Sequence, residues 1–235
     1  QVRYDKPISL TEGGGIVAAQ SQFIYRYDGT FDGFLCCVAE AFRDKALPQG
    51  IQLLDEPQAT LFPVKEVAAQ PGLAQRVERS LVSRVSPEAH GMVRRGFLTC
   101  MEEKELHLLR FILLGYKHGR KVTRLATNPD VHALDKALLY LKNEAHYHVE
   151  FLRFADCGGF LVAVITPNNM VLPLIAPHFC ERFNTESFVI YEKTHSLGFV
   201  HQAGGRRPFF PAEGLELPAP TEDDEKYRAR RPRFY

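Results

Sequence analysis

Helical periodicity dominates the middle of the chain. Apolar residues recur there at i, i+3, i+4 and i+7, in segments at about 72–85, 87–101 and 103–117. A fourth segment starts at Asn128-Pro129-Asp130, which supplies a cap, a first-turn proline and an acidic first turn. Its apolar face continues to about Arg153. The pattern predicts four successive helices, with a helical subdomain at about 72–127.

Strand-like segments lie on both sides of this middle. FIYRYD, from Phe23, has the β-branched and aromatic content of a strand, and Gly29 then turns the chain into a helix that ends near Lys45. The segment Ile51–Val64 is typical of strands and turns. Towards the end of the chain, FLRFAD and FLVAVITP flank Cys157-Gly158-Gly159, as the strands of a hairpin would.

The remaining pattern completes the expected architecture. MVLPLIAPHFCERF suits a short helix, and FVIYEKTHSLGFVHQ indicates two strands around a turn near His195. We therefore predict an α/β or α+β fold, with a helical middle and a mostly antiparallel sheet. A single α/β domain is expected over 23–203. Residues 1–22 are interpreted as an extension or artificial remnant, and 204–235 as a peripheral or flexible tail.

Composition places the chain among globular proteins of the reducing cytoplasm. Of its 235 residues, 45% are hydrophobic and 24% are charged. The cysteines form neither a C-x-x-C pair nor the triple spacing of an iron–sulfur site; they are Cys36, Cys37, Cys100, Cys157 and Cys180. No signal peptide or membrane-spanning apolar run is recognised. These features predict a soluble cytoplasmic protein without a membrane partner.

Positive charge is concentrated in one region. Between Gly72 and Ala126 there are eleven Lys/Arg and five Glu, a local excess of six, although the whole chain has a formal charge of +1. Such a segment favours phosphate contacts, because the planar guanidinium group of arginine can donate two hydrogen bonds to phosphate oxygens. The candidate nucleic-acid-binding residues are Arg94, Arg95, Lys117, Arg120, Lys121 and Arg124. The alternative is a solvated cationic helix end that satisfies the helix dipole.

A second candidate lies in HYHVEFLRF, which starts at His146. His146 and Arg153 are seven residues apart, so two helical turns would bring them to one side. His178 and Arg182, four apart, would also share a helix face. Together these four residues predict a small basic rim for a phosphate or a partner's carboxylate. In the alternative interpretation, both arginines pair with internal carboxylates.

The residue spacings favour neither a metal nor a catalytic nucleophile. His146 and His148 would lie about 200° apart on a helix, because each residue turns it by about 100°. Cys36 and Cys37 sit among apolar neighbours, and no serine lies in a G-x-S-x-G elbow. We therefore expect no metal and no cofactor, and no catalytic residue is assigned.

Several stretches together resemble a known family. YRYDGTFDGFLCCVAEAF, NEAHYHVEFLRF and LPLIAPHFCERF, followed by FVIYEKTH, occur in the order found in a bacterial family of DNA metabolism or repair proteins. Its members are typically encoded beside a radical-SAM protein of DNA modification or repair, and some are fused to a uracil-DNA glycosylase-like domain. The likeness covers about 23–202, with a weaker match at EDDEKYRARRPRFY. No glycosylase domain is recognised here, so glycosylase chemistry is not carried over.

The resemblance and the basic segment lead to one expected function and two alternatives. The expectation is a DNA-binding accessory protein of DNA repair or modification that works with a radical-SAM partner. That partner would hold the iron–sulfur cluster, since this chain lacks the cysteine motif. The first alternative is an autonomous enzyme acting on a nucleic-acid base or backbone. The second is a structural adaptor without nucleic-acid contact.

Overall fold

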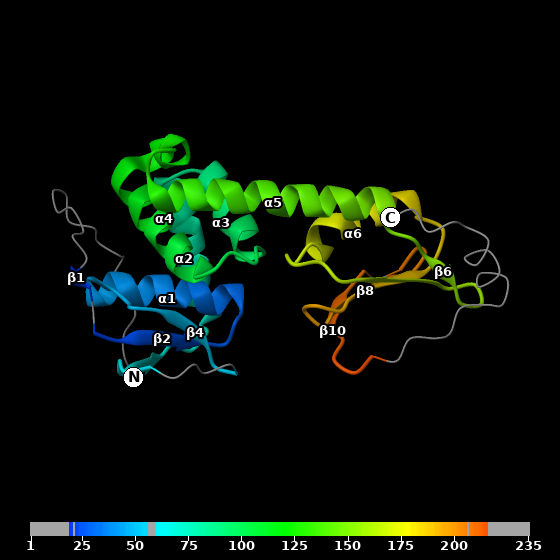
Figure 1. Cartoon of the computed structure of the whole chain (residues 1–235), viewed down its shortest axis with the longest axis horizontal. Coiled ribbons are helices and arrows are strands. Elements are labelled where there is room, and N and C mark those ends of the chain that lie inside the picture. Colours follow the sequence, from blue (N-terminus) through cyan, green and yellow to red (C-terminus); the bar gives the residue numbers. More distant parts are fainter. Residues whose placement is uncertain (1–18, 21, 56–59, 206, 216–235) are drawn as a thin grey trace. The chain divides into compact units, whose positions relative to one another are not determined.

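A computed structural model describes residues 19–20, 22–55, 60–205 and 207–215 (Figure 1). Its helices are α1 (Phe31–Asp44), α2 (Pro71–Arg84), α3 (Pro87–Phe97), α4 (Lys104–His118), the 3-10 helix η1 (Gly119–Arg124), α5 (Pro129–Phe151) and α6 (Leu172–Arg182). Its strands are β1 (Ala19–Gln20), β2 (Ile24–Tyr27), β3 (Ala46–Leu47), β4 (Ile51–Leu53), β5 (Val64–Glu66), β6 (Ala155–Asp156), β7 (Leu161–Ile165), β8 (Phe188–Glu192), β9 (Leu197–His201) and β10 (Phe209–Pro211).

The described chain forms two compact units. Unit 1 takes in the residues up to Phe97 together with Glu103–Ala133, and unit 2 takes in Leu98–Glu102 and the residues from Leu134 onward. The described chain combines α-helices with a parallel three-stranded sheet and a mixed five-stranded sheet, an α+β fold that confirms the predicted class. The expected N-terminal extension and C-terminal tail fall largely outside the described residues.

In unit 1, β2 is the centre of a three-stranded parallel sheet, between β4 and β5. Figure 1 shows α1 lying along this sheet. The rings of Tyr25 and Tyr27 are buried, yet each hydroxyl has a partner. Tyr25 Oη donates to Asp44 and Tyr27 Oη donates to Glu105, both at 2.8 Å. The aromatic strand predicted from FIYRYD therefore packs both tyrosine rings inward with their hydroxyl groups hydrogen-bonded.

The helical middle follows the predicted boundaries except at one place. Hydroxyl side chains cap the start of two helices: Thr30 accepts the Gly33 N–H at 3.0 Å at the start of α1, and Ser86 accepts the Ala89 N–H at the start of α3, within the helical middle. The helix expected at about 87–101 ends earlier, at Phe97. The chain leaves the helix there because Leu98 and the residues after it bond to a distant loop: the Leu98 carbonyl accepts the Met170 N–H at 2.9 Å.

Helix α5 begins as its sequence signals predict. The side-chain oxygen of Asn128 accepts the N–H groups of Asp130 and Val131, and Pro129 fills the first helical position. Val131, Leu134 and Leu141 on its predicted apolar face are buried. The helix ends at Phe151, two residues before the expected Arg153.

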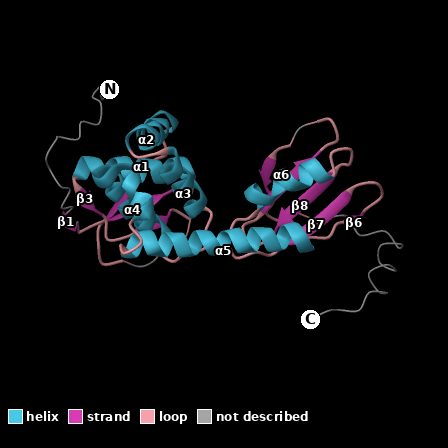
Figure 2. Cartoon of the chain, turned by 90° about the horizontal axis from the view of Figure 1, so that it is seen from above, coloured by secondary structure: helices cyan, strands magenta, loops and turns pink. Residues whose placement is uncertain are grey.

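Unit 2 contains a five-stranded sheet in the order β10-β9-β8-β7-β6. All neighbours are antiparallel except β7 and β8, so this sheet is mostly antiparallel, as predicted. The β6–β7 and β8–β9 hairpins confirm two further expectations. Helix α6 packs against β8 and β9 (Figure 2), and Phe154 contacts the rings of Phe179, Phe183 and Phe188 in the core between them.

Candidate nucleic-acid interface and a buried acid–histidine cluster

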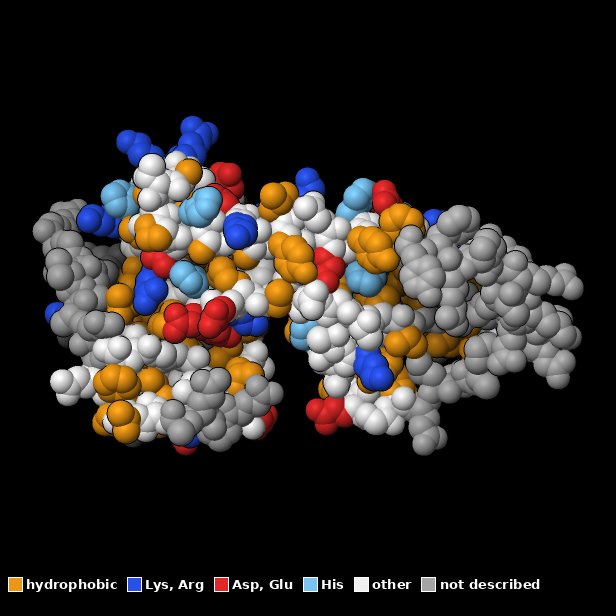
Figure 3. All heavy atoms as spheres, viewed as in Figure 1, with side chains coloured by type: hydrophobic (Ala, Val, Ile, Leu, Met, Phe, Trp, Pro, Cys, Tyr) orange, Lys and Arg blue, Asp and Glu red, His pale blue; other side chains and the backbone are white. Residues whose placement is uncertain are grey.

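Four exposed cations gather where α4 passes into η1. They are Lys117, Arg120, Lys121 and Arg124, and together they are called the basic loop here. Gly119 ends α4 with a positive φ of 58°, a conformation that suits glycine. The buried side chain of Val122 anchors η1 to unit 1. The anchored loop therefore turns its long cationic side chains to solvent, and Figure 3 shows Lys and Arg side chains projecting at one end of unit 1.

The cations of the basic loop carry no compensating carboxylates. None of the four forms an ion pair or side-chain hydrogen bond with any residue that the structure describes. By contrast, Arg110 on the same helix α4 lies 3.5 Å from the carboxylate of Asp130. Unpaired exposed guanidinium and ammonium groups are the donors that phosphate oxygens accept from. The helix dipole also favours cations at the end of α4, so the dipole interpretation remains compatible with this arrangement.

The other two predicted cations, Arg94 and Arg95, lie on α3 in a different environment. Arg94 donates to Glu78 at 2.7 Å and its guanidinium lies 5.2 Å from the ring centroid of Phe31. Glu78 also bonds His90 at 2.8 Å. The hydrogen bond from His90, and to a lesser extent that from Arg94, lowers the pKa of Glu78 below its usual value. Arg94 is therefore partly neutralised within the fold, whereas Arg95 is exposed and forms no ion pair with a described residue.

The predicted basic rim is only partly assembled in unit 2. His146 is exposed and lies 3.1 Å from Glu150, one turn along α5. Arg153 lies beyond the end of α5, so helical spacing does not align it with His146. His178 and Arg182 share α6, and Arg182 lies 5.6 Å from the ring centroid of Phe183. Neither arginine pairs with a carboxylate within the described ranges, and no hydrogen bond there joins the two pairs of rim residues.

Sequence reasoning missed a more tightly built cluster in unit 2, around Glu192. The side chain of Glu192, at the end of β8, is 0% exposed. One carboxylate oxygen accepts the backbone N–H of Leu172 at 2.7 Å, at the start of α6. The other accepts Nδ1–H of His195 at 2.5 Å. Two donors and the positive end of a helix thus hold a buried carboxylate in place.

A second carboxylate of unit 2, Glu144, is fixed by one loop. Glu144 on α5 accepts the backbone N–H of Asn168 at 2.8 Å and that of Asn169 at 2.9 Å. The side-chain amide of Asn169 adds a third donor at 2.6 Å. Burial alone would raise the pKa of Glu144, but these donors favour the ionised form and bring the pKa below its usual value. Glu144 is therefore a fixed negative charge at neutral pH.

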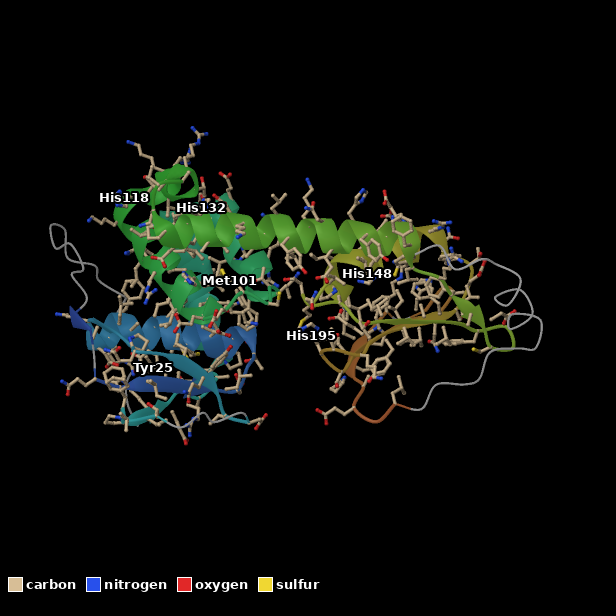
Figure 4. All side chains as sticks on the ribbon, viewed as in Figure 1. Tyr25, Met101, His118, His132, His148 and His195 are labelled. Carbon is tan, nitrogen blue, oxygen red and sulfur yellow. The ribbon has the colours of Figure 1, made fainter. Side chains whose placement is uncertain are left out.

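His148 lies one turn after Glu144 on α5, and Figure 4 labels it together with His195. Burial lowers its pKa, and the nearby carboxylates of Glu144 and Glu192 oppose that shift without cancelling it. Its ring nitrogens form no hydrogen bond with a described residue. The sequence does hold one signal for this cluster: Phe188 and Ile190 point into the core, so the alternation of β8 also directs Glu192 inward.

A family model named DUF4130, described as a domain of unknown function, matches residues 102–235, which is more than half of the chain. The chain belongs to the DUF4130 family. The DUF4130 match includes the basic loop, the four rim residues and the Glu192 cluster, whereas Arg94 and Arg95 precede it. No curated protein and no solved structure gives a significant match to the chain.

The described residues offer neither a candidate metal-binding group nor a candidate membrane span. In those ranges, no three His, Cys, Asp or Glu side chains come together in a group able to hold a metal ion. None of the helices in the described part of the chain combines the length and apolarity needed to cross a membrane.

Proposed function

We propose that this DUF4130 protein is a DNA-binding accessory protein of DNA repair or modification, and that the basic loop contacts DNA phosphates. The observation that supports the proposal is the set of four exposed cations without a described ion-pair partner, held by a short anchored turn. Contacts of this kind read no base edge, so binding should be largely independent of sequence. Released counterions should make it strongly dependent on salt.

The proposal also includes a radical-SAM protein as the working partner. Its support is the resemblance of YRYDGTFDGFLCCVAEAF, NEAHYHVEFLRF and LPLIAPHFCERF to DNA metabolism proteins encoded beside such a partner. In this proposal the partner holds the iron–sulfur cluster and this chain contacts the DNA. Cys37 suits no ligand role, because burial raises the pKa of its thiol far above the usual range.

The test replaces Arg120, Lys121 and Arg124 together by glutamine. The matched control replaces Lys136, Lys142 and Lys193, which are exposed cations outside the loop, so both triple variants lose three positive charges. Fluorescence anisotropy with labelled duplexes of two unrelated sequences gives affinity at several salt concentrations. We expect the loop variant to bind both duplexes more weakly and to lower the salt slope by about 2 to 3.

Two outcomes would contradict the interface. Equal affinities of the loop variant and the parent protein would remove the basic loop from it. Equal losses in the loop and control variants would indicate a general charge effect instead. Co-purification of the tagged protein with the radical-SAM candidate tests the partner separately. Partner binding without DNA binding would favour the adaptor alternative.

A further inference from the structure

Three aromatic side chains are exposed along one face of α5, and the proposed phosphate contacts do not use them. They are Tyr140, Tyr147 and Phe151, together called the aromatic stripe here. Tyr140 precedes Tyr147 by seven residues and Phe151 follows it by four, so helical geometry places the three on one side. All three belong to unit 2, and Figure 3 shows hydrophobic side chains exposed over α5. The solvent side of a helix is normally polar, so a row of exposed rings is a candidate binding surface.

Contacts within the protein hold the rings of the stripe in place. Tyr147 and Phe151 are 57% and 58% exposed, and their ring centroids lie 5.0 Å apart. The Tyr147 ring also meets the half-buried ring of His148 edge to face, at a centroid distance of 5.5 Å. Tyr140 is 48% exposed, and its hydroxyl accepts the side-chain amide of Asn168 at 3.0 Å. The rings are therefore ordered before a ligand arrives, so little side-chain freedom is lost on binding.

The charges beside the stripe suit an anionic ligand. The carboxylates along 140–151 are Glu144 and Glu150. Glu144 accepts N–H groups from the loop described above, and Glu150 lies 3.1 Å from His146. Arg153, two residues after Phe151, is exposed and forms no ion pair with a described residue. Both carboxylates are thus occupied within the protein, whereas the cation is available to a phosphate group.

We propose that the aromatic stripe binds single-stranded DNA, with the rings of Tyr147 and Phe151 stacking on unpaired bases. DNA as the ligand rests on the proposed function, and the stripe specifies the unpaired form. The bases of a duplex stack on one another, whereas unpaired bases offer flat faces to aromatic side chains. Tyr140 lies two helical turns earlier, about 10 Å along the axis, and contacts a further base of the same strand. Stacking reads no base edge, so the stripe tolerates any sequence.

The experiment measures fluorescence anisotropy with the full chain and three labelled ligands of equal length. They are a single-stranded DNA, its duplex, and a single strand of abasic deoxyribose phosphates. The test variant combines Tyr147→Ala with Phe151→Ala. The matched control, Leu139→Ala, also removes an apolar side chain from α5; Leu139 is 59% exposed and lies about 100° around the helix from Tyr140. Circular dichroism checks that each variant is folded.

The double variant should bind the single strand about tenfold more weakly or worse, because each stacked base adds to affinity. Its duplex affinity should match that of the parent protein, and so should both affinities of the control. The salt slope for the single strand should not change, since the rings release no counterions, whereas the basic-loop variant should lower it. The abasic strand should bind the parent protein and the double variant equally.

A tryptophan variant reports the stacking directly. The chain contains no tryptophan, so Tyr147→Trp places a single indole fluorophore in the stripe. The single strand should quench its emission and the abasic strand should not. This readout keeps the test decisive if the double variant fails to fold.

The results that overturn the stripe differ from those that overturn the basic loop. Single-strand affinity that survives the double substitution would refute the stacking, as would equal binding of normal and abasic strands without quenching of the tryptophan. Duplex binding that still depends on the basic loop would then leave the proposed function standing. Single-strand binding that needs the rings but not the basic loop would keep the stripe and remove the loop. A double variant that keeps strand binding but no longer co-purifies with the radical-SAM candidate would make the stripe a protein-docking surface, against this inference.

Discussion

Glu144 illustrates how one carboxylate can fix a loop. Its ionised form accepts N–H groups from Asn168 and Asn169, and its folded-state pKa is below the usual 4.5. A lowered folded-state pKa means that the ionised group contributes stability above about pH 4.5. That contribution is lost as the pH falls through the folded-state pKa, because folding then no longer favours the charged form.

We predict that Glu144→Gln lowers the free energy of unfolding by about 1 to 2 kcal/mol at pH 7, since charged acceptors form the stronger hydrogen bonds. The deficit should shrink below pH 4.5, where the parent protein loses the same contribution. Urea unfolding from pH 7 down to pH 3 measures both. Glu150→Gln, on the exposed side of the same helix, is the control and should change stability by less than about 0.5 kcal/mol. A deficit that does not vary with pH would contradict this account.

At the scale of elements, β10 depends on a glycine in its neighbour. Gly198 on β9 lies opposite Phe210 on β10, and a Cβ at Gly198 would overlap the Phe210 ring. Because β10 pairs only with β9 in the described sheet, the ring cannot move without loosening the edge strand. The glycine therefore sets how closely the last described strand approaches the sheet.

Gly198→Ala should cost about 1 to 3 kcal/mol of unfolding free energy and should make the β9–β10 connection more sensitive to protease. Adding Phe210→Leu, which shortens the opposing side chain, should restore part of both. Gly72→Ala is the control, because no atom lies within 4 Å of its added Cβ. If the double variant is no more stable than Gly198→Ala alone, the ring overlap is not the cause.

Elements with local signals could be predicted, and those set by distant contacts could not. The cap at Asn128 and the turn at Gly158-Gly159 depend on residues adjacent in the sequence, so the start of α5 and the β6–β7 hairpin could be predicted from the sequence. The end of α3 could not, because Leu98 leaves the helix to bond Met170, a residue more than seventy positions away. The candidate site divides in the same way: the basic loop is one continuous run, whereas Glu192 reaches the backbone N–H of Leu172 only after folding.

On the scale of the whole molecule, each unit has its own buried core. Leu81 is fully buried in unit 1, and Phe179 is buried in unit 2. We predict that calorimetric unfolding departs from a single two-state transition. Leu81→Ala should lower mainly one component and Phe179→Ala mainly the other, each by several kcal/mol. Equal shifts of one sharp transition in both variants would show that the two cores unfold together.

Unit 2 is assembled from segments that are not adjacent in the chain, which limits the choice of fragments that can be expressed alone. The short segment Leu98–Glu102 lies between two stretches of unit 1, yet it belongs to unit 2. Its Cys100 N–H donates to Asn169 at 2.9 Å, on the loop that also holds Glu144. A fragment that starts at residue 102, where the family match begins, lacks this strap, so the side-chain oxygen of Asn169 loses the Cys100 N–H and the Met170 N–H loses the Leu98 carbonyl. A self-contained fragment would instead need residues 98–102 reattached through a designed linker, in the manner of a circular permutant.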